Sequence, residues 1–205
     1  MGTASSAVDL WENVYATKPL DQVSWHQQHA ATSLRLITDA TDPTATVIDV
    51  GAGASPLTED LLLAGYRDVT ALDVSTHALA VVRARLGDRP GVTYIVTDLL
   101  AWQPDRTYDV WHDRAVFHFL TDPADRARYI AIANRSMTPG GVLVLGTFAA
   151  DGPTSCSGLP TARYDAAGLA KLFAAGFTTE RIHGEDHRTP GGARQPFTWV
   201  VLRRQ

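Results

Sequence analysis

Apolar and polar residues alternate in blocks along most of this chain. Five short apolar runs have the length of buried strands and are bounded by turn residues. These runs cover residues 47–50, 69–73, 92–96, 108–112 and 141–148. Between them, apolar residues recur at helical spacing over residues 56–64, 76–86 and 123–137. A chain in which strands and helices alternate predicts an α/β domain, with a mostly parallel sheet covered by helices on both faces.

The segments on either side of this block carry further elements. Near the N-terminus, one helical face predicts a short helix and is formed by Leu10, Trp11, Val14 and Tyr15. Residues 33–40 are predicted to be the end of a second helix. After the fifth run, the pattern predicts a helix near 165–175 and strands near 177–182 and 198–202.

Composition narrows the class of protein. The chain has 205 residues, of which 45% are hydrophobic and 20% charged, as in a folded globular domain. The net charge of −4 lacks the positive excess of a nucleic-acid binder, so no nucleic-acid partner is expected. Cys156 is the single cysteine, residues 1–8 lack an apolar leader core, and no apolar run reaches the ~20 residues of a membrane span. We expect a cytoplasmic protein without a membrane segment.

A glycine turn after the first run is the strongest local signal. The sequence D-V-G-A-G-A-S at residues 49–55 leads from a strand into a helix, and Asp73 ends the next strand. This layout is typical of a nucleotide-binding βαβ unit, with the acid placed for ribose hydroxyls. Pro56 occupies the position of the third glycine of the dinucleotide fingerprint, and Asp49 would repel a pyrophosphate. A ligand with an ammonium group and a positive sulfur suits this carboxylate better.

In five sequence pieces and their order, the chain resembles the class I S-adenosylmethionine-dependent methyltransferases over about residues 10–150. The pieces are D-V-G-A-G-A-S at 49–55, L-D-V at 72–74, T-D-L-L at 97–100, Y-D-V-W-H-D-R at 108–114 and M-T-P-G-G at 137–141. Ser55 departs from the third glycine that the family often has. The resemblance implies a Rossmann-like, doubly wound sheet of seven strands, with an antiparallel last strand that forms a hairpin with its predecessor.

The resemblance also implies the organisation of the chain. We expect a single domain over residues 1–205. It would consist of a helical cap at 1–40, a cofactor-binding core at 45–150, and a substrate-side part at 151–205 with a loop, a helix and the C-terminal hairpin.

The implied cofactor is S-adenosyl-L-methionine, with S-adenosyl-L-homocysteine as its product. Asp73 is expected to bind the ribose; a helix N-cap is its alternative role, but Ser75 already offers that group. Asp98 is expected near the adenine amino group, or else acts as a turn residue. The N-terminal aromatic residues either close the crevice or belong to the core. The predicted cofactor residues are Asp49, Gly51, Ala52, Gly53, Ser55, Asp73, Val74, Asp98, Leu99, Trp11, Tyr15 and Trp25.

Candidate catalytic residues lie around the end of the fourth run: His112, Asp113 and His118. His118 is a plausible general base because an unperturbed histidine has a pKa of about 6.5. Its alternative role is a half-buried wall residue between two phenylalanines. Asp113 either takes part in the chemistry or orients Arg114 or the cofactor amine.

The C-terminal part holds weaker candidates. The polar loop at 154–160 could form a flap over the acceptor, with Arg163 binding an anionic group, or be an ordinary loop around an unreactive Cys156. His183 and His187 are predicted to lie in a loop-like setting without further spaced ligands, so no metal site is expected.

The favoured function is methyl transfer to sulfur, oxygen or nitrogen of a small molecule. Asp113-Arg114 resembles small enzymes of the thiopurine and tellurite-resistance group. The alternative is a protein lysine N-methyltransferase, because residues 11–15 resemble the W-E-x-V-Y stretch of such enzymes, although residues 113–115 depart from their usual D-K-G. A non-catalytic nucleotide-binding module and a dehydrogenase are less consistent with the glycine turn and Asp73.

Overall fold

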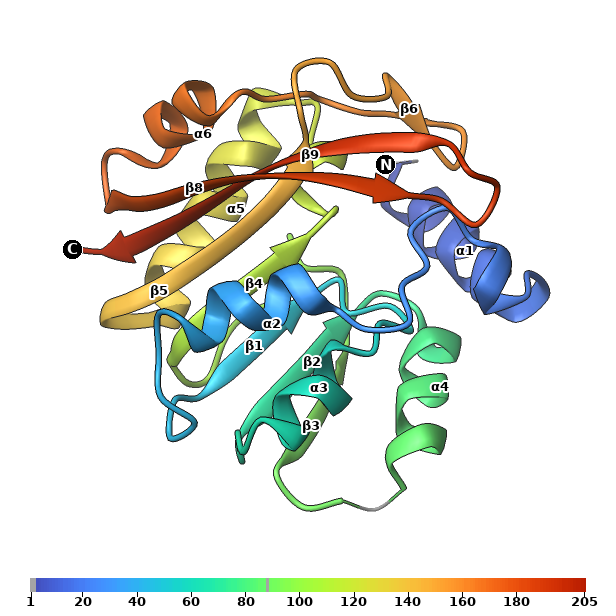
Figure 1. The fold of residues 1–205 in the computed structure, drawn as a ribbon, viewed down its shortest axis with the longest axis horizontal. Coiled ribbons are helices and arrows are strands. Elements are labelled where there is room, and N and C mark those ends of the chain that lie inside the picture. Colours follow the sequence, from blue (N-terminus) through green and yellow to red (C-terminus); the bar gives the residue numbers. More distant parts are fainter. Residues whose placement is uncertain (1–2, 88) are drawn as a thin grey trace.

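The computed structural model describes residues 3–87 and 89–205 and is built around one seven-stranded sheet (Figure 1). The strands are β1 Val47–Val50, β2 Val69–Asp73, β3 Val92–Val96, β4 Tyr108–Arg114, β5 Met137–Phe148, β8 Phe177–Arg188 and β9 Arg194–Arg204. Their order in the sheet is β3-β2-β1-β4-β5-β9-β8. Strands β1 to β5 pair in parallel, whereas β9 runs antiparallel to both β5 and β8. This arrangement confirms the predicted doubly wound sheet and its C-terminal hairpin.

Helices cover both faces of the sheet. They are α1 Thr3–Thr17, α2 Ala31–Thr38, α3 Leu57–Leu63, α4 Thr76–Leu86, α5 Pro123–Ser136 and α6 Ala166–Phe173, with short 3-10 turns η1 Leu20–Gln22 and η2 Phe117–Phe119. One core layer packs α5 and α6 against the sheet, and the other packs α2 and α3 against the opposite face (Figure 1). Ser75 caps α4 by accepting a hydrogen bond from the Ala78 N–H at 3.1 Å, so the N-cap identified in the sequence is confirmed.

The strand order reverses between β1 and β4. From β1 the chain adds β2 and β3 on one side, then crosses to β4 on the other side. In open α/β sheets, ligands bind beyond the carboxyl ends of the strands at this reversal point. The glycine turn directly follows β1, and residues 112–114 end β4. The topology therefore brings these two segments to the same edge.

Several element bounds differ from the sequence prediction. Strand β4 continues to Arg114, β5 begins at Met137, and the polar loop contains the small hairpin of β6 Ser155–Cys156 and β7 Leu159–Pro160. His183 and His187 lie within β8, so the loop-like setting assigned to them was wrong. Strand β8 is an edge strand that pairs with β9 over its whole length, and charged residues on an edge discourage pairing with other chains. This polar composition disguised it as a loop.

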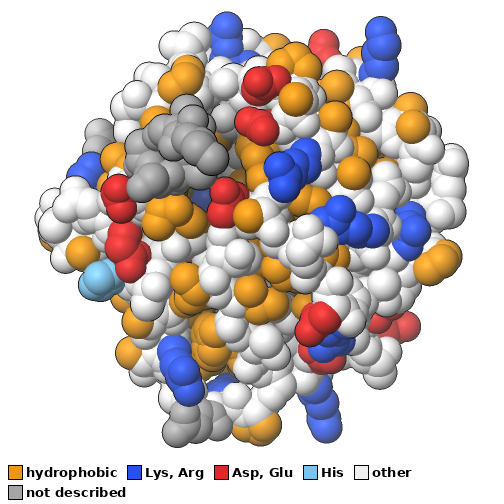
Figure 2. Space-filling model, turned by 180° about the vertical axis from the view of Figure 1, so that it is seen from behind, with side chains coloured by type: hydrophobic (Ala, Val, Ile, Leu, Met, Phe, Trp, Pro, Cys, Tyr) orange, Lys and Arg blue, Asp and Glu red, His pale blue; other side chains and the backbone are white. Residues whose placement is uncertain are grey.

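The surface carries both signs of charge. Figure 2 shows the side opposite to Figure 1, where Lys and Arg side chains are interspersed with Asp and Glu and with apolar groups. In the described residues, no helix is both long and apolar enough to cross a bilayer.

Candidate functional site

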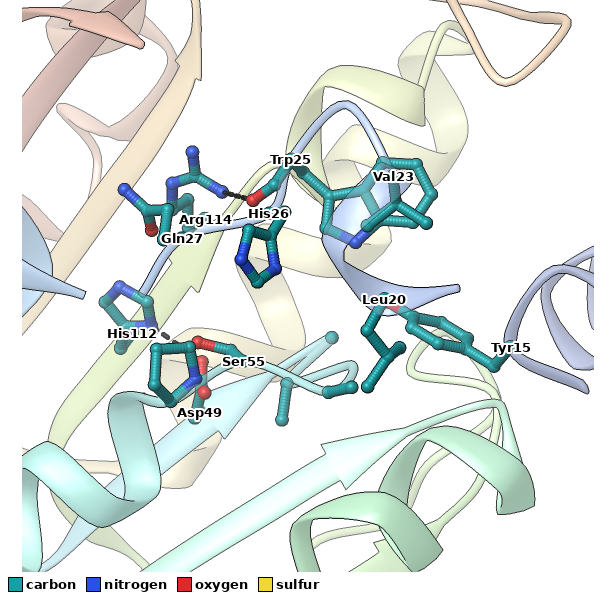
Figure 3. A pocket seen from close by; sticks show the side chains of 14 residues that line it. Tyr15, Leu20, Val23, Trp25, His26, Gln27, Asp49, Ser55, His112 and Arg114 are labelled. Atoms are coloured by element: carbon teal, nitrogen blue, oxygen red, sulfur yellow. Dashed lines mark hydrogen bonds and ion pairs between the residues drawn. The ribbon is translucent and has the colours of Figure 1, made fainter. Parts of the chain in front are cut away.

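A narrow crevice opens at the reversal point between β1 and β4 (Figure 3). Its volume of about 60 Å³ is far below the ~300 Å³ of typical small-molecule sites. Side chains of the segment that joins α1 to α2 cover one wall. The lining residues are Tyr15, Leu20, Val23, Trp25, His26, Gln27, Asp49, Gly51, Ala52, Ala54, Ser55, Pro56, His112 and Arg114.

The floor of the crevice is the glycine turn. Gly51 and Gly53 have φ angles of +65° and +54°, in the left-handed region that favours glycine. A Cβ at Gly51 would lie 2.0 Å from Cγ2 of Val116, and one at Gly53 would lie 2.3 Å from the Tyr15 hydroxyl. Glycine is therefore required for both the turn and the close approach of its neighbours. From outside, Arg85 donates hydrogen bonds to the carbonyls of residues 54 and 55 and fixes the end of the turn.

Asp73 connects the glycine turn to the end of β2. One carboxylate oxygen accepts the Gly53 N–H at 2.8 Å, and the other accepts the Ser75 N–H at 2.8 Å. Burial raises the pKa of Asp73 to about 6, although both backbone hydrogen bonds favour its charged form. An ionised carboxylate has about four acceptor positions, so capacity remains for hydroxyl donors.

Asp49 and His112 form a buried pair across β1 and β4. The two residues are in register, and Asp49 Oδ1 lies 2.6 Å from His112 Nδ1. The other ring nitrogen of His112 lies 2.9 Å from the Ser33 hydroxyl. Both side chains line the crevice, as Figure 3 shows, but the imidazole is held between two fixed partners. The pair therefore contributes a carboxylate to the wall and a rigidly positioned ring.

Asp113 is held on the opposite face of the sheet, because side chains alternate along a strand. Its carboxylate is fully buried and accepts hydrogen bonds from the N–H groups of Val116 and Phe117, at 2.9 and 3.1 Å, and from the Tyr129 hydroxyl at 2.7 Å. Burial raises the pKa of Asp113 to about 6. Asp113 therefore faces away from the crevice, where a catalytic residue would be expected. It holds the turn that places Val116 against Gly51.

His118 also lies away from the crevice. Its ring is fully buried and stacks on Phe148 with 4.3 Å between centroids, and its Nδ1 accepts the Phe148 N–H at 3.4 Å. Burial lowers the pKa of His118 to about 3, with a further contribution from the charge of Arg114. The ring is neutral at pH 7 and a weak base, so the geometry favours the wall-residue alternative over the expected catalytic role.

The remaining predicted cofactor residues surround the crevice at different distances. Asp98 accepts the Leu100 N–H at 2.9 Å, which is the turn role considered as its alternative, and Leu99 is buried in the core. Trp11 packs edge-to-face on Trp25 with centroids 5.6 Å apart. The crevice itself brings together Asp49, Gly51, Ala52, Ser55, Tyr15, Trp25 and His112, with Gly53 and Asp73 directly beside it. Val74 follows Asp73, outside the lining set.

Sequence reasoning missed three polar lining residues: His26, Gln27 and Arg114. Arg114 is the last residue of the Y-D-V-W-H-D-R motif at 108–114. Its position at the end of a strand could have identified it as a lining residue. The other two lie in the loop before α2, and no local pattern marks them.

The residues considered for anion or metal binding in the C-terminal part have other partners. Arg163 donates to the carbonyl of residue 150 at 3.2 Å. Arg35 donates to His183 Nε2 at 3.0 Å, and His187 donates to the Ser24 carbonyl at 2.7 Å. Within residues 3–87 and 89–205, no three His, Cys, Asp or Glu side chains converge as metal ligands.

Comparisons with known proteins show which proteins the chain is similar to. Residues 47–141 match the family described as "Methyltransferase domain". The match covers 95 of the 205 residues, from β1 to the start of β5, and the sheet topology and the glycine turn agree with it.

Three relatives illustrate the similarity. Malonyl-[acyl-carrier protein] O-methyltransferase 2 of Ilyobacter polytropus is 22% identical over 65% of this chain and 51% of its own length. Trans-aconitate 2-methyltransferase of Rhizobium leguminosarum is 34% identical over 48% of this chain and 36% of its own. The structure of 1,6-didemethyltoxoflavin-N1-methyltransferase of Burkholderia thailandensis aligns with a TM-score of 0.72 and 21% identity, over 98% of this chain and 86% of its own. The chain spans about half the length, or less, of these two curated relatives.

Proposed function

We propose that this protein transfers the methyl group of S-adenosylmethionine to a sulfur, oxygen or nitrogen atom of a small molecule. The observation that carries the proposal is the Asp73 carboxylate, which is bonded to the glycine turn at the reversal point and lies beside the Asp49 wall. The Burkholderia structure holds S-adenosylhomocysteine together with 1,6-didemethyltoxoflavin, and the names of the two curated relatives specify malonyl-[acyl-carrier protein] and trans-aconitate. The toxoflavin and aconitate names and the Asp113-Arg114 pair support a small-molecule enzyme like those of the thiopurine and tellurite-resistance group.

The described residues fit this donor. Asp73 would bind the ribose hydroxyls, the glycine turn would lie against the methionine part, and Asp49 would face its positive charges. When bound, S-adenosylmethionine supplies an electrophilic methyl group on a sulfonium. The protein contributes orientation and exclusion of water, for which Val23 and Trp25 already cover the crevice.

The predicted bases are poorly placed to remove a proton from an acceptor. Asp113 and His118 are sealed in the core, and His112 is engaged by Asp49 and Ser33. A thiolate or a carboxylate is already a nucleophile and needs no general base. We therefore propose an acceptor that reacts in a form already deprotonated at neutral pH.

Calorimetry with S-adenosylhomocysteine tests the donor assignment directly. Saturable binding is expected, and the absence of heat at millimolar ligand with folded protein would reject the proposal. NADH binding without binding of the sulfur ligand would instead favour a dehydrogenase. A tritiated-methyl assay against fractionated extract then tests the acceptor. Labelled small products are expected, whereas label only on protein would favour the lysine methyltransferase alternative.

The affinity for S-adenosylhomocysteine is expected to fall as the pH drops through about 6. Burial raises the pKa of Asp73 to about 6. Its carboxylate is therefore ionised at pH 7 and becomes protonated as the pH falls below about 6. Only the ionised form accepts charge-assisted bonds from both ribose hydroxyls, so the dissociation constant should rise about tenfold per pH unit below the transition. Calorimetry from pH 5 to 8 measures this slope. Asp73→Asn should bind weakly with no such slope, and an identical slope in that variant would contradict the assignment.

A further inference from the structure

Arg114 ends β4, and among the described residues no carboxylate forms an ion pair with its guanidinium. Its Nη1 donates to the Trp25 carbonyl at 3.4 Å, while Nε and Nη2 are sealed from solvent and have no hydrogen-bond partner in the described part of the chain. The central carbon of the guanidinium, Cζ, lies 4.9 Å from the centre of the Phe197 ring. The carboxylates of Glu185 and Asp49 act on it electrostatically, but neither forms an ion pair with it among the described residues.

An unpaired buried guanidinium is costly, and proteins rarely retain one without a partner. The neighbouring carboxylates hold other donors. Glu185 accepts the Trp199 indole N–H at 2.7 Å and the Gln27 amide N–H at 3.5 Å, and Asp49 pairs with His112. The two free positions, Nε and Nη2, lie on one edge of the guanidinium. That edge matches the two oxygens of a carboxylate in a bidentate pair.

The position of Arg114 separates it from the donor-binding end of the crevice. Asp73 and the glycine turn belong to β1 and β2, whereas Arg114 faces Phe197 on β9 and Glu185 on β8, on the other side of β4. Figure 3 shows Arg114 beside Gln27 and above His112, away from Tyr15. A group bound to Arg114 thus lies on the acceptor side.

We infer that Arg114 binds a carboxylate of the methyl acceptor, which makes the acceptor a carboxylate-bearing small molecule. This inference rests on the proposed function. Because Nε and Nη2 are sealed from solvent, the segment around Trp25 and Gln27 has to move for this carboxylate to reach them.

Malonate binding to the protein saturated with S-adenosylhomocysteine tests the inference. Calorimetry should show saturable malonate binding to the wild type and to Arg163→Met, which removes an exposed arginine that bonds loop carbonyls. Arg114→Met should weaken malonate binding at least tenfold, and inorganic phosphate should bind the wild type more weakly than malonate. Absence of saturable malonate binding in the wild type, equal binding in Arg114→Met, or tighter binding of phosphate would each overturn the inference.

The carboxylate of the methyl donor could pair with Arg114 in place of an acceptor carboxylate. A nucleoside that lacks this carboxylate, 5′-methylthioadenosine, distinguishes the two cases. Arg114→Met should bind S-adenosylhomocysteine and 5′-methylthioadenosine within twofold of the wild type. A tenfold loss for S-adenosylhomocysteine alone would assign Arg114 to the donor and overturn the inference. If the wild type fails to bind either nucleoside, the proposed function itself fails, whatever malonate does.

Thermal melting without ligand distinguishes a binding role from a structural one. Removal of an unpaired buried charge should leave the melting temperature of Arg114→Met equal to or above that of the wild type. A melting temperature lower by ten degrees would show that the fold depends on Arg114, which contradicts the inference. Arg114→Lys keeps the charge without the paired edge, so it should fold and bind malonate at least tenfold more weakly than the wild type.

Discussion

Asp73→Ala is expected to weaken binding of S-adenosylhomocysteine by about 10- to 150-fold, or roughly 1.5–3 kcal/mol. Asp73 is 7% exposed and its carboxylate accepts the Gly53 N–H, so it lies where the sheet edge meets the glycine turn. Hydrogen bonds from ribose hydroxyls to a buried charged acceptor are among the stronger single contacts in such a site. Calorimetry at pH 7.5, above the transition expected for this carboxyl, gives the change directly.

Asp73 also holds the Ser75 N–H, so loss of affinity has to be separated from loosening of the β2–α4 turn. Ser75→Ala is the matched control, since it removes the helix cap and leaves the carboxylate in place. This control should lose about 1 kcal/mol of stability and bind the ligand within twofold of the wild type. Unchanged affinity in Asp73→Ala would show that the ribose lies elsewhere, and an equal loss in both variants would assign the effect to the turn.

The sheet and the glycine turn after β1 were predictable because their signals are local. The strand at 47–50, the left-handed glycines and the acid at the end of β2 lie within 27 residues, from 47 to 73, and each depends on its own sequence neighbourhood. The alternation of strands and helices then fixes the topology, since crossover connections in parallel sheets have one hand. The reversal point follows from that topology without any side-chain information.

The surroundings of residues 112–118 were less predictable because they depend on which face of the strand each side chain takes and on distant covering segments. From the sequence, His112, Asp113 and Arg114 were treated as one cluster. Neighbouring residues on a strand face opposite sides of the sheet, so Asp113 points away from the other two. His118 is buried by Phe148, which lies 30 residues further along the chain. Arg114 is covered by Trp25, 89 residues earlier. No local pattern encodes such contacts.

Asp113→Ala is expected to lower the free energy of unfolding by about 3 kcal/mol or more. The substitution leaves the N–H groups of Val116 and Phe117 and the Tyr129 hydroxyl without their acceptor, and each buried unsatisfied donor costs about 1–3 kcal/mol. Release of the carboxylate from its costly burial offsets part of this loss. Urea unfolding followed by tryptophan fluorescence measures the change, and Asp113→Asn should recover part of the stability because its amide oxygen still accepts a bond.

Asp109→Ala provides the comparison at the opposite end of the same strand. Its carboxylate accepts bonds from the Thr46 N–H and from the hydroxyls of Thr46 and Thr138, but it is partly exposed, so water replaces some of the lost contacts and the destabilisation should be smaller. Only Asp113→Ala should also reduce affinity for S-adenosylhomocysteine, by a few fold, because Val116 rests on the glycine turn. A folded Asp113→Ala variant with wild-type stability and lost methyl transfer would restore the direct catalytic role that the buried geometry argues against.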